Sequence, residues 1–146
     1  MSQATLTVEV DVAPEQLFDV IVDFDRYSEF LSEIGMLSNR VLRKSDRDAE
    51  VEASVKKMGF TETYTLRYEF ERPKRVSWSL IKGKLTKDNK GGWELEAIGP
   101  GRTRANYRIE ASFGWMVPKA LVMKGIETEL PKLLRAFKKR AESLSA

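Results

Sequence analysis

PKALVMKGIETELPKLLRAFKKRAESL, residues 118–144, is the stretch of sequence that decides the fold. Its apolar residues recur at steps of three and four, as on one face of a helix several turns long: Val122, Ile126, Leu130, Leu133, Phe137, Ala141 and Leu144. Pro118 suits the first turn of this helix, whereas Pro131 lies in its interior and removes a backbone hydrogen bond. We therefore predict one long C-terminal helix with a kink near residues 127–130. Periodicity alone favours a helix that closes a core over one that covers a ligand pocket.

Most of the chain before this helix alternates between apolar and polar residues, which is typical of half-buried strands. Such segments lie at residues 5–12, 36–44, 48–56, 60–70, 76–80, 93–97 and 103–113. Two short helices are expected after the first strand, one beginning at Pro14 and one containing Tyr27 and ending at Gly35. Short turns between the later strands favour hairpins and hence an antiparallel sheet of about seven strands. A sheet wrapped around the long C-terminal helix would bury both apolar faces, which predicts an α+β fold.

The length of 146 residues predicts a single domain, residues 1–146, large enough for a core without disulfides or metals. The chain has neither Cys nor His, so thiolate and imidazole ligands are excluded, and we expect no metal and no cofactor. The first twenty residues are rich in acidic side chains and lack the apolar segment of a signal peptide. No apolar run approaches the roughly 20 residues of a membrane span. We therefore expect a soluble, cytoplasmic protein.

Three parts of the sequence resemble a known family. They are DFDRYSEFL at residues 23–31, LIKG at 80–83 followed by GGWEL at 91–95, and FKKRAE at 137–142. In this order they resemble the START-like (SRPBCC) superfamily and, within it, the coenzyme Q-binding/polyketide cyclase family, which includes the bacterial ribosome-association toxin. The resemblance spans nearly the whole chain. It implies the helix-grip fold, with a hydrophobic-ligand cavity between the sheet and the C-terminal helix. The loop that we expect at residues 83–93 departs from the family, because it is more polar here.

Large aromatic side chains at inward-facing strand positions, together with apolar residues of the helix, form the predicted ligand-binding face. Its members are Tyr64, Tyr68, Trp78, Trp93, Tyr107, Met123, Ile126 and Leu130. These side chains either fill a core, with their polar atoms at its rim, or line a cavity on the order of a few hundred Å3. The family resemblance favours the cavity.

Glu62 is the exception on this face. It shares the inward parity of Phe60 and Tyr64, and a buried carboxylate is costly unless it is paired or protonated. Alternatively, the turn at residues 58–59 or a bulge directs its side chain to water, and we favour this interpretation. We assign no catalytic residue; if the protein is an enzyme, Glu62 is the candidate acid–base residue, with Tyr64 or Tyr107 as the hydrogen-bond donor.

Non-enzymatic binding of a hydrophobic small molecule is the function that we expect, with a quinone or other isoprenoid, a lipid or a polyketide-like compound as the ligand. The sequence offers few catalytic groups, because the serines have no His to activate them and no Gly-rich phosphate loop is present. A cyclase or dehydrase that folds a reactive chain in a shaped pocket is the second candidate.

The C-terminal region is basic, since residues 116–146 contain seven Lys or Arg against three Glu, in a chain of net charge +3. Contact with the ribosome, as a regulator of translation, or with a membrane surface is therefore the third candidate. A solvated helix face is the simpler interpretation. Aromatic residues take inward positions whereas Arg67, Arg104 and Arg108 take outward ones, which argues against a base-stacking surface. We expect no binding to DNA.

Overall fold

One antiparallel sheet forms most of the computed structural model, which describes residues 2–57 and 59–144. Its strands are β1 (Ser2–Val10), β2 (Met36–Lys44), β3 (Asp48–Lys57), β4 (Phe60–Glu71), β5 (Arg75–Lys82), β6 (Thr86–Gly99) and β7 (Arg102–Phe113). They follow the order β1-β7-β6-β5-β4-β3-β2 across the sheet. Consecutive strands from β2 to β7 are therefore neighbours, and β1 pairs with β7 at the far edge.

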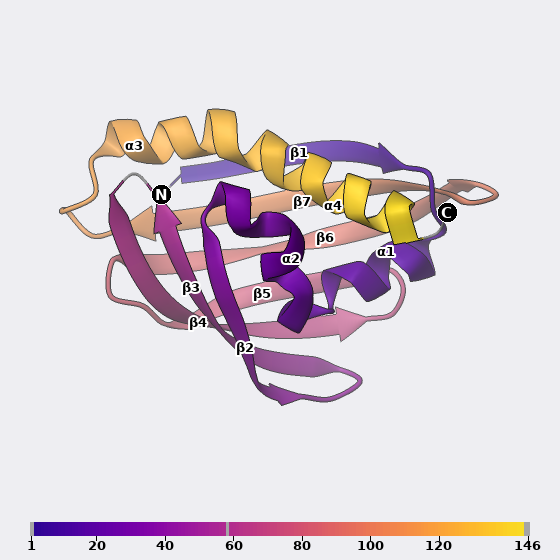
Figure 1. Ribbon diagram of the computed structural model, residues 1–146, viewed down its shortest axis with the longest axis horizontal. Coiled ribbons are helices and arrows are strands. Elements are labelled where there is room, and N and C mark those ends of the chain that lie inside the picture. Colours follow the sequence, from indigo (N-terminus) through magenta and orange to yellow (C-terminus); the bar gives the residue numbers. More distant parts are fainter. Residues whose placement is uncertain (1, 58, 145–146) are drawn as a thin grey trace.

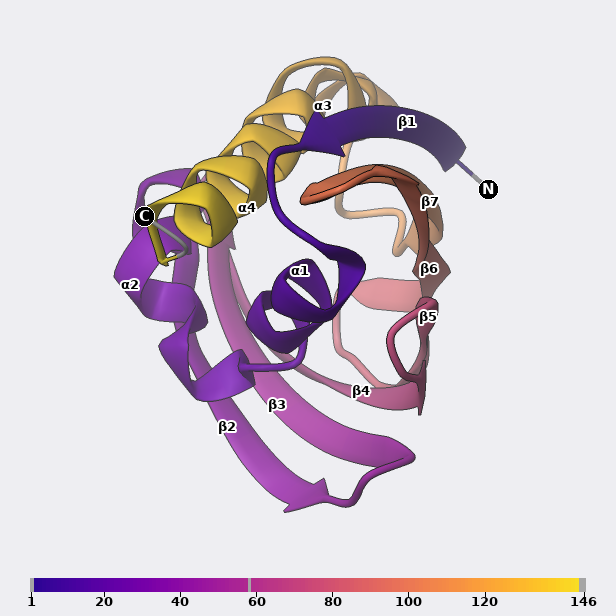
Figure 2. The ribbon, with the colours of Figure 1, turned by 90° about the vertical axis from the view of Figure 1, so that its right-hand side faces the viewer.

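Helices occupy two places in the chain. Between β1 and β2 lie α1 (Pro14–Ile21), η1 (Phe24–Arg26), α2 (Tyr27–Leu31) and η2 (Ser32–Ile34). The C-terminal helix consists of α3 (Lys119–Lys124), a π-helical turn, η3 (Gly125–Glu129), and α4 (Leu130–Leu144). Figure 1 shows this helix running along the length of the sheet, and Figure 2 shows the sheet curving around α1 and the helix. The predicted helix-grip arrangement is confirmed.

The predicted strands are found, with one correction at the start of β6. The polar loop predicted at residues 83–93 spans only residues 83–85, because β7 is long enough to pair with the polar segment that follows. Thr86 pairs with Phe113 and Asn89 with Ala111. Gly91 allows close packing there, since a Cβ at this position would lie 2.1 Å from the carbonyl oxygen of Arg108. Polar composition at residues 84–90 therefore does not indicate a loop.

The C-terminal helix changes its hydrogen bonding one turn before Pro131. The N–H of Leu130 donates to the carbonyl of Gly125, five residues back, which is the π-helical pattern. Pro131 has no N–H to donate to the preceding turn, so the regular ladder is interrupted where the sequence predicts a kink. Figure 1 shows that the helix bends between α3 and α4.

The apolar stripe of the helix faces the sheet over most of its length. Phe137 and Ala141 are buried, but Leu144, at the end of α4, is 62% exposed. Leu134, which the predicted stripe does not contain, is buried. The stripe prediction is therefore wrong at its last member. Two polar contacts fix the end of α4: Lys138 pairs with Glu142 at 2.6 Å, and Arg140 pairs with Glu29 at 2.8 Å.

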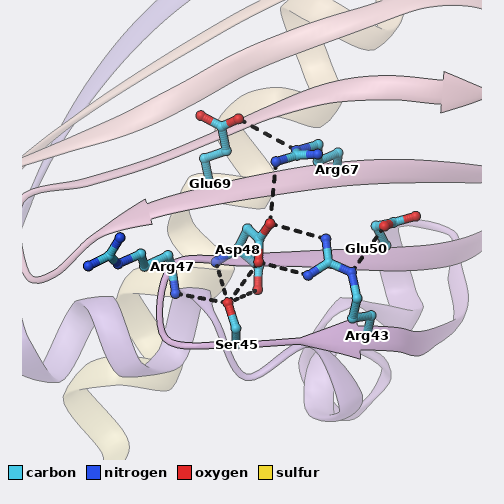
Figure 3. Close-up of polar contacts among 7 residues, drawn as sticks. All are labelled: Arg43, Ser45, Arg47, Asp48, Glu50, Arg67 and Glu69. Atoms are coloured by element: carbon cyan, nitrogen blue, oxygen red, sulfur yellow. Dashed lines mark hydrogen bonds and ion pairs between the residues drawn. The ribbon is translucent and has the colours of Figure 1, made fainter.

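The turn between β2 and β3 is held by a network of charged side chains on the outer surface (Figure 3). The carboxylate of Asp48 pairs with Arg43 at 2.9 Å and with Arg67 at 3.3 Å, so that it joins three strands. Ser45 donates its hydroxyl to the same carboxylate at 2.7 Å. Hydrogen bonds from Arg43 and then Ser45 lower the pKa of Asp48 to about 2.

Candidate functional site

Aromatic side chains fill one half of the space between the sheet and the C-terminal helix. Trp93 lies with its ring centroid 4.9 Å from that of Tyr107 and 5.2 Å from that of Phe137 on α4. Trp78 lies 5.4 Å from Tyr107 and 6.2 Å from Tyr68. All five side chains are buried, and edge-to-face and tilted contacts at these distances are favourable. This half of the interior is a packed core.

A cavity of about 610 Å3, open on one side, occupies the other half. It lies between the inner face of the sheet and the part of the helix that contains α3, η3 and the first residue of α4. Its walls are mostly apolar, and the apolar lining side chains include Phe60, Leu85, Ile109, Val122, Ile126 and Leu130. Pockets of this size and lining are typical of small-molecule sites.

The predicted ligand-binding residues divide between these two halves. Tyr64, Ile126 and Leu130 line the cavity. Tyr68, Trp78, Trp93 and Tyr107 lie instead in the packed cluster. Met123 is 40% exposed and lies outside the cavity lining, because it is one residue away from the stripe that contains Val122 and Ile126. This placement corrects the predicted lining.

Glu62 on β4 is buried at the wall of the cavity and is surrounded by hydrogen-bond donors. Its Oε2 accepts three successive backbone N–H groups, from Lys84 at 2.8 Å, Leu85 at 2.6 Å and Thr86 at 2.8 Å. Its Oε1 accepts the hydroxyl of Thr86 at 2.6 Å. Successive N–H groups that converge on one anion form a nest, which stabilises a buried negative charge without a basic side chain. We call these donors the loop nest.

Our preferred interpretation, that Glu62 escapes to water, is wrong. The side chain is only 8% exposed and follows the inward parity of β4. The cost of burying the carboxylate is offset by the loop nest, which comes from the connection between β5 and β6, more than 20 residues further along the chain. Gly83 permits this approach, since a Cβ there would lie 2.8 Å from the carbonyl oxygen of Thr86.

Other polar residues also line the cavity, and Tyr64 and Asn89 are two of them. Burial, and then the charge of Glu62, raise the pKa of Tyr64 to about 12, so its hydroxyl remains protonated and can donate. This hydroxyl has no hydrogen-bond partner within the described part of the chain. Asn89 accepts a hydrogen bond from the indole N–H of Trp78 at 2.9 Å, which leaves its own NH2 group as a donor. The cavity therefore offers donors to an oxygen atom of a ligand.

Sequence reasoning missed several lining residues, and strand parity could have identified some of them. Ile109 has the inward parity of Tyr107 but was not singled out because it is not aromatic. Asn89 has the parity of Trp93, so extending the β6 pattern by four residues would have placed it inward. The donors of the loop nest carry no such signal, because backbone N–H groups do not depend on residue type.

Neither a metal cluster nor a membrane span is found in the described residues. No group of acidic side chains at 2–57 and 59–144 is arranged to hold a metal ion. No helix within these same ranges is both long and apolar enough to cross a membrane.

Solved structures of other proteins share this fold. The Zhui aromatase/cyclase from a Streptomyces species superposes with a TM-score of 0.87 at 14% identity, covering 99% of this chain and 96% of that one. A START superfamily protein from Mycobacterium smegmatis gives a TM-score of 0.84 at 18% identity, covering 97% and 98%. These likenesses show a shared fold.

Curated relatives are similar over almost the full length. The ribosome association toxin RatA of Vibrio cholerae is 25% identical over 144 residues, which cover 99% of this chain and 98% of the relative. RatA of Escherichia coli is 22% identical over 144 residues, covering 99% of this chain and 89% of the relative. Residues 10–138 match the family described as polyketide cyclase / dehydrase and lipid transport. The expected resemblance is thus confirmed, and the chain belongs to the polyketide cyclase / dehydrase and lipid transport family.

Proposed function

We propose that the protein binds a largely apolar small molecule in this cavity and does not transform it. The observation that supports this function is the cavity itself, with about 610 Å3 of space and mostly apolar walls. A quinone or other isoprenoid, a lipid or a polyketide-like compound would fit this chemistry. Burial of its apolar surface would supply most of the affinity, at about 25 cal/mol per Å2.

Polar groups would orient the ligand inside the cavity. The hydroxyl of Tyr64 and the NH2 group of Asn89 can donate hydrogen bonds to a ligand carbonyl or hydroxyl oxygen. A ligand with an oxygen-bearing end and an apolar remainder would therefore bind more tightly than a pure hydrocarbon of the same size.

The test is a matched pair of tryptophan substitutions on the C-terminal helix. Ile126→Trp fills the cavity from η3, whereas Thr128→Trp adds the same bulk on the exposed side of the same turn. Native mass spectrometry and lipid extraction would identify a co-purifying ligand, and binding of a ubiquinone analogue would be followed for each variant. We expect at least tenfold weaker binding for Ile126→Trp and unchanged binding for Thr128→Trp. Equal binding by both variants, or no binding by the wild type, would contradict the proposal.

The position of Glu62 makes a cyclase reaction the weaker candidate. An acid–base residue must exchange a proton with the substrate, and it needs a free lone pair within hydrogen-bond reach. Oε2 of Glu62 already accepts three N–H groups, and Oε1 accepts the Thr86 hydroxyl, so only the second lone pair of Oε1 remains for a substrate. This arrangement favours a structural role for the carboxylate.

Ribosome association is a second candidate function, favoured by the near-complete coverage of the chain by relatives named as ribosome association toxins. The exposed basic side chains of α4 would provide the electrostatic contact, and they include Arg135 and Lys139. Lys138 and Arg140 are unsuitable, because both are engaged in the contacts that fix the end of the helix.

Co-sedimentation with ribosomal subunits would test this candidate. We expect an association that weakens steeply as the salt concentration rises, and reversing the charges of Arg135 and Lys139 should abolish it. Reversing Arg47 and Lys74, which are exposed on turns outside the helix, is the control. Association that survives the first pair of substitutions would exclude this face of α4.

A further inference from the structure

An exposed apolar loop connects β7 to α3 beside the open side of the cavity. Trp115 is 93% exposed and Met116 is 57% exposed, although both are large apolar side chains. Their neighbours Phe113 and Val117 line the cavity, and Phe113 is itself 37% exposed, so the exposed pair lies beside a part of the cavity wall that reaches solvent. Figure 1 shows this loop projecting at the left-hand end of the molecule. We call Trp115 and Met116 the apolar tip.

The apolar tip is held in place by hydrogen bonds of the backbone. The N–H of Gly114 donates to the carbonyl of Leu85 at 2.7 Å, and the N–H of Val117 donates to that of Gly114 at 3.0 Å. The first bond links the tip to the connection between β5 and β6, which also forms the loop nest of Glu62. The tip is therefore presented by two joined loops.

Basic side chains are concentrated in the two segments that present the apolar tip. The two joined segments, residues 82–90 and 113–124, contain six lysines and a single acidic residue, Asp88. Lys90 pairs with Glu110, and the other five lysines form no ion pair with the described residues: Lys82, Lys84, Lys87, Lys119 and Lys124. All five are exposed, and a Cβ on Gly114 would lie 3.3 Å from Cε of Lys87, which places this lysine beside the tip.

We propose that this end of the protein docks on the surface of an anionic lipid membrane, with the apolar tip in the interfacial region and the lysines among the headgroups. Trp favours the membrane interface because its ring is apolar and its N–H is polar, and Met adapts to irregular surroundings. Juxtaposed lysines add electrostatic attraction to anionic lipid. The cavity entrance then faces the bilayer, so an apolar ligand can pass without crossing water. Membrane docking is a function in addition to the proposed ligand binding, and it does not depend on that binding.

A membrane fits this surface better than RNA or a second copy of the chain. Neither segment contains an Arg, the side chain that most often combines with aromatic rings at single-stranded nucleic acid. Two copies that met through this end would bring their unpaired lysines together, which is unfavourable.

Vesicle binding tests the proposal, and the tip supplies its own fluorescent probe. Trp78 and Trp93 are buried, so a change in tryptophan emission on membrane binding would come mainly from Trp115. We expect the wild type to float with vesicles of phosphatidylcholine and phosphatidylglycerol, with a blue shift in emission, and to bind pure phosphatidylcholine much more weakly. Trp115→Ser should weaken binding about tenfold. Leu42→Ser, at an exposed apolar side chain of β2, is the matched control and should change nothing.

Charge variants complete the design. Each lysine near an anionic surface contributes about fivefold to binding, so reversing both Lys84 and Lys87 should weaken it by more than 25-fold. Ile126→Trp, which fills the cavity, should bind vesicles like the wild type, and this separates docking from ligand binding. A lack of binding of the wild-type protein to anionic vesicles would overturn the proposal. So would a Trp115→Ser effect seen only on ribosome co-sedimentation or only on self-association by light scattering.

Discussion

Replacing Glu62 by Gln tests whether the loop nest stabilises the fold. The substitution keeps the shape of the side chain and removes its charge. The amide oxygen can still accept the three N–H groups of residues 84–86, and the Thr86 hydroxyl can rotate to accept from the new NH2 group. What is lost is the charge on the acceptor.

The size of the effect follows from the number of hydrogen bonds. A bond to a charged group contributes about 1.5–3 kcal/mol and a neutral one about 0.5–1.5 kcal/mol, so three bonds lose about 3 kcal/mol together. The neutral amide is cheaper to bury, which offsets part of this loss. We expect Glu62→Gln to lower the free energy of unfolding by about 1–2 kcal/mol. Glu62→Ala should cost more, about 3 kcal/mol, because the N–H groups lose their acceptor.

Urea unfolding followed by circular dichroism measures this difference. The control is Glu69→Gln on the same strand, where the carboxylate is exposed and its 3.5 Å ion pair with Arg67 contributes little. The m-value should be unchanged in all variants, since the same surface is exposed on unfolding. Identical midpoints for Glu62→Gln and Glu69→Gln would refute the stabilising role of the loop nest.

Three other properties follow from the structure. Tyr27, Tyr68 and Tyr107 are buried and Tyr64 is half-buried, and burial raises the pKa of all four tyrosines of the chain, that of Tyr64 to about 12. Because their unfolded value is 10.0, their contribution to stability is present below pH 10 and is lost above it, so tyrosinate absorbance should rise only together with unfolding. The pKa of Asp48 is lowered from 3.8 to about 2, so its charge stabilises the folded state above pH 3.8, and this stability is lost as the pH falls towards about 2. Asp48→Asn should therefore reduce the dependence of the melting temperature on pH in this range, as measured by thermal unfolding scans. Gly91→Ala would place a Cβ 2.1 Å from a backbone oxygen and 2.9 Å from the Trp78 ring, and it should destabilise the protein by about 1–3 kcal/mol in urea unfolding. Gly99→Ala on the same strand is the control, because a Cβ there has no atom within 4 Å and should leave the stability nearly unchanged.

Much of the fold could be predicted because strand parity and helix periodicity are local properties. The inward residues of β7, such as Ala105 and Tyr107, are buried as their alternation predicts. Pro131 marked the irregular turn of the helix for an equally local reason, its missing N–H. The start of β6 was missed because residues 84–90 are polar, and polarity was taken to indicate a loop. Two of these polar residues make hydrogen bonds inside the fold: Thr86 donates to Glu62, and Asn89 accepts the indole N–H of Trp78.

The site was less predictable because it depends on contacts between distant parts of the chain. Parity correctly placed Glu62 on the inner face, but its donors lie 22 to 24 residues further along, and no local pattern connects them. Parity also identified the aromatic residues as inward-facing, without showing which of them meet a bulky partner. Phe137 on α4 contacts Trp93 and closes the core there, whereas Ile126, which precedes the bend of the helix, lines the cavity.

Side-chain size along the strands explains why one half of the interior is packed and the other is hollow. On β7 the inward residues shrink from Tyr107 to Ile109 to Ala111 towards the end that carries the apolar tip, and the larger Phe113 that follows is 37% exposed at the end of the strand. Phe24 and Tyr27, from the helices after β1, add further rings at the packed half only. The bend at η3 and the small residues opposite it therefore leave space at the same end where Trp115 is exposed. A binding cavity and a membrane-docking tip at one end would let a poorly soluble ligand enter by the shortest apolar route.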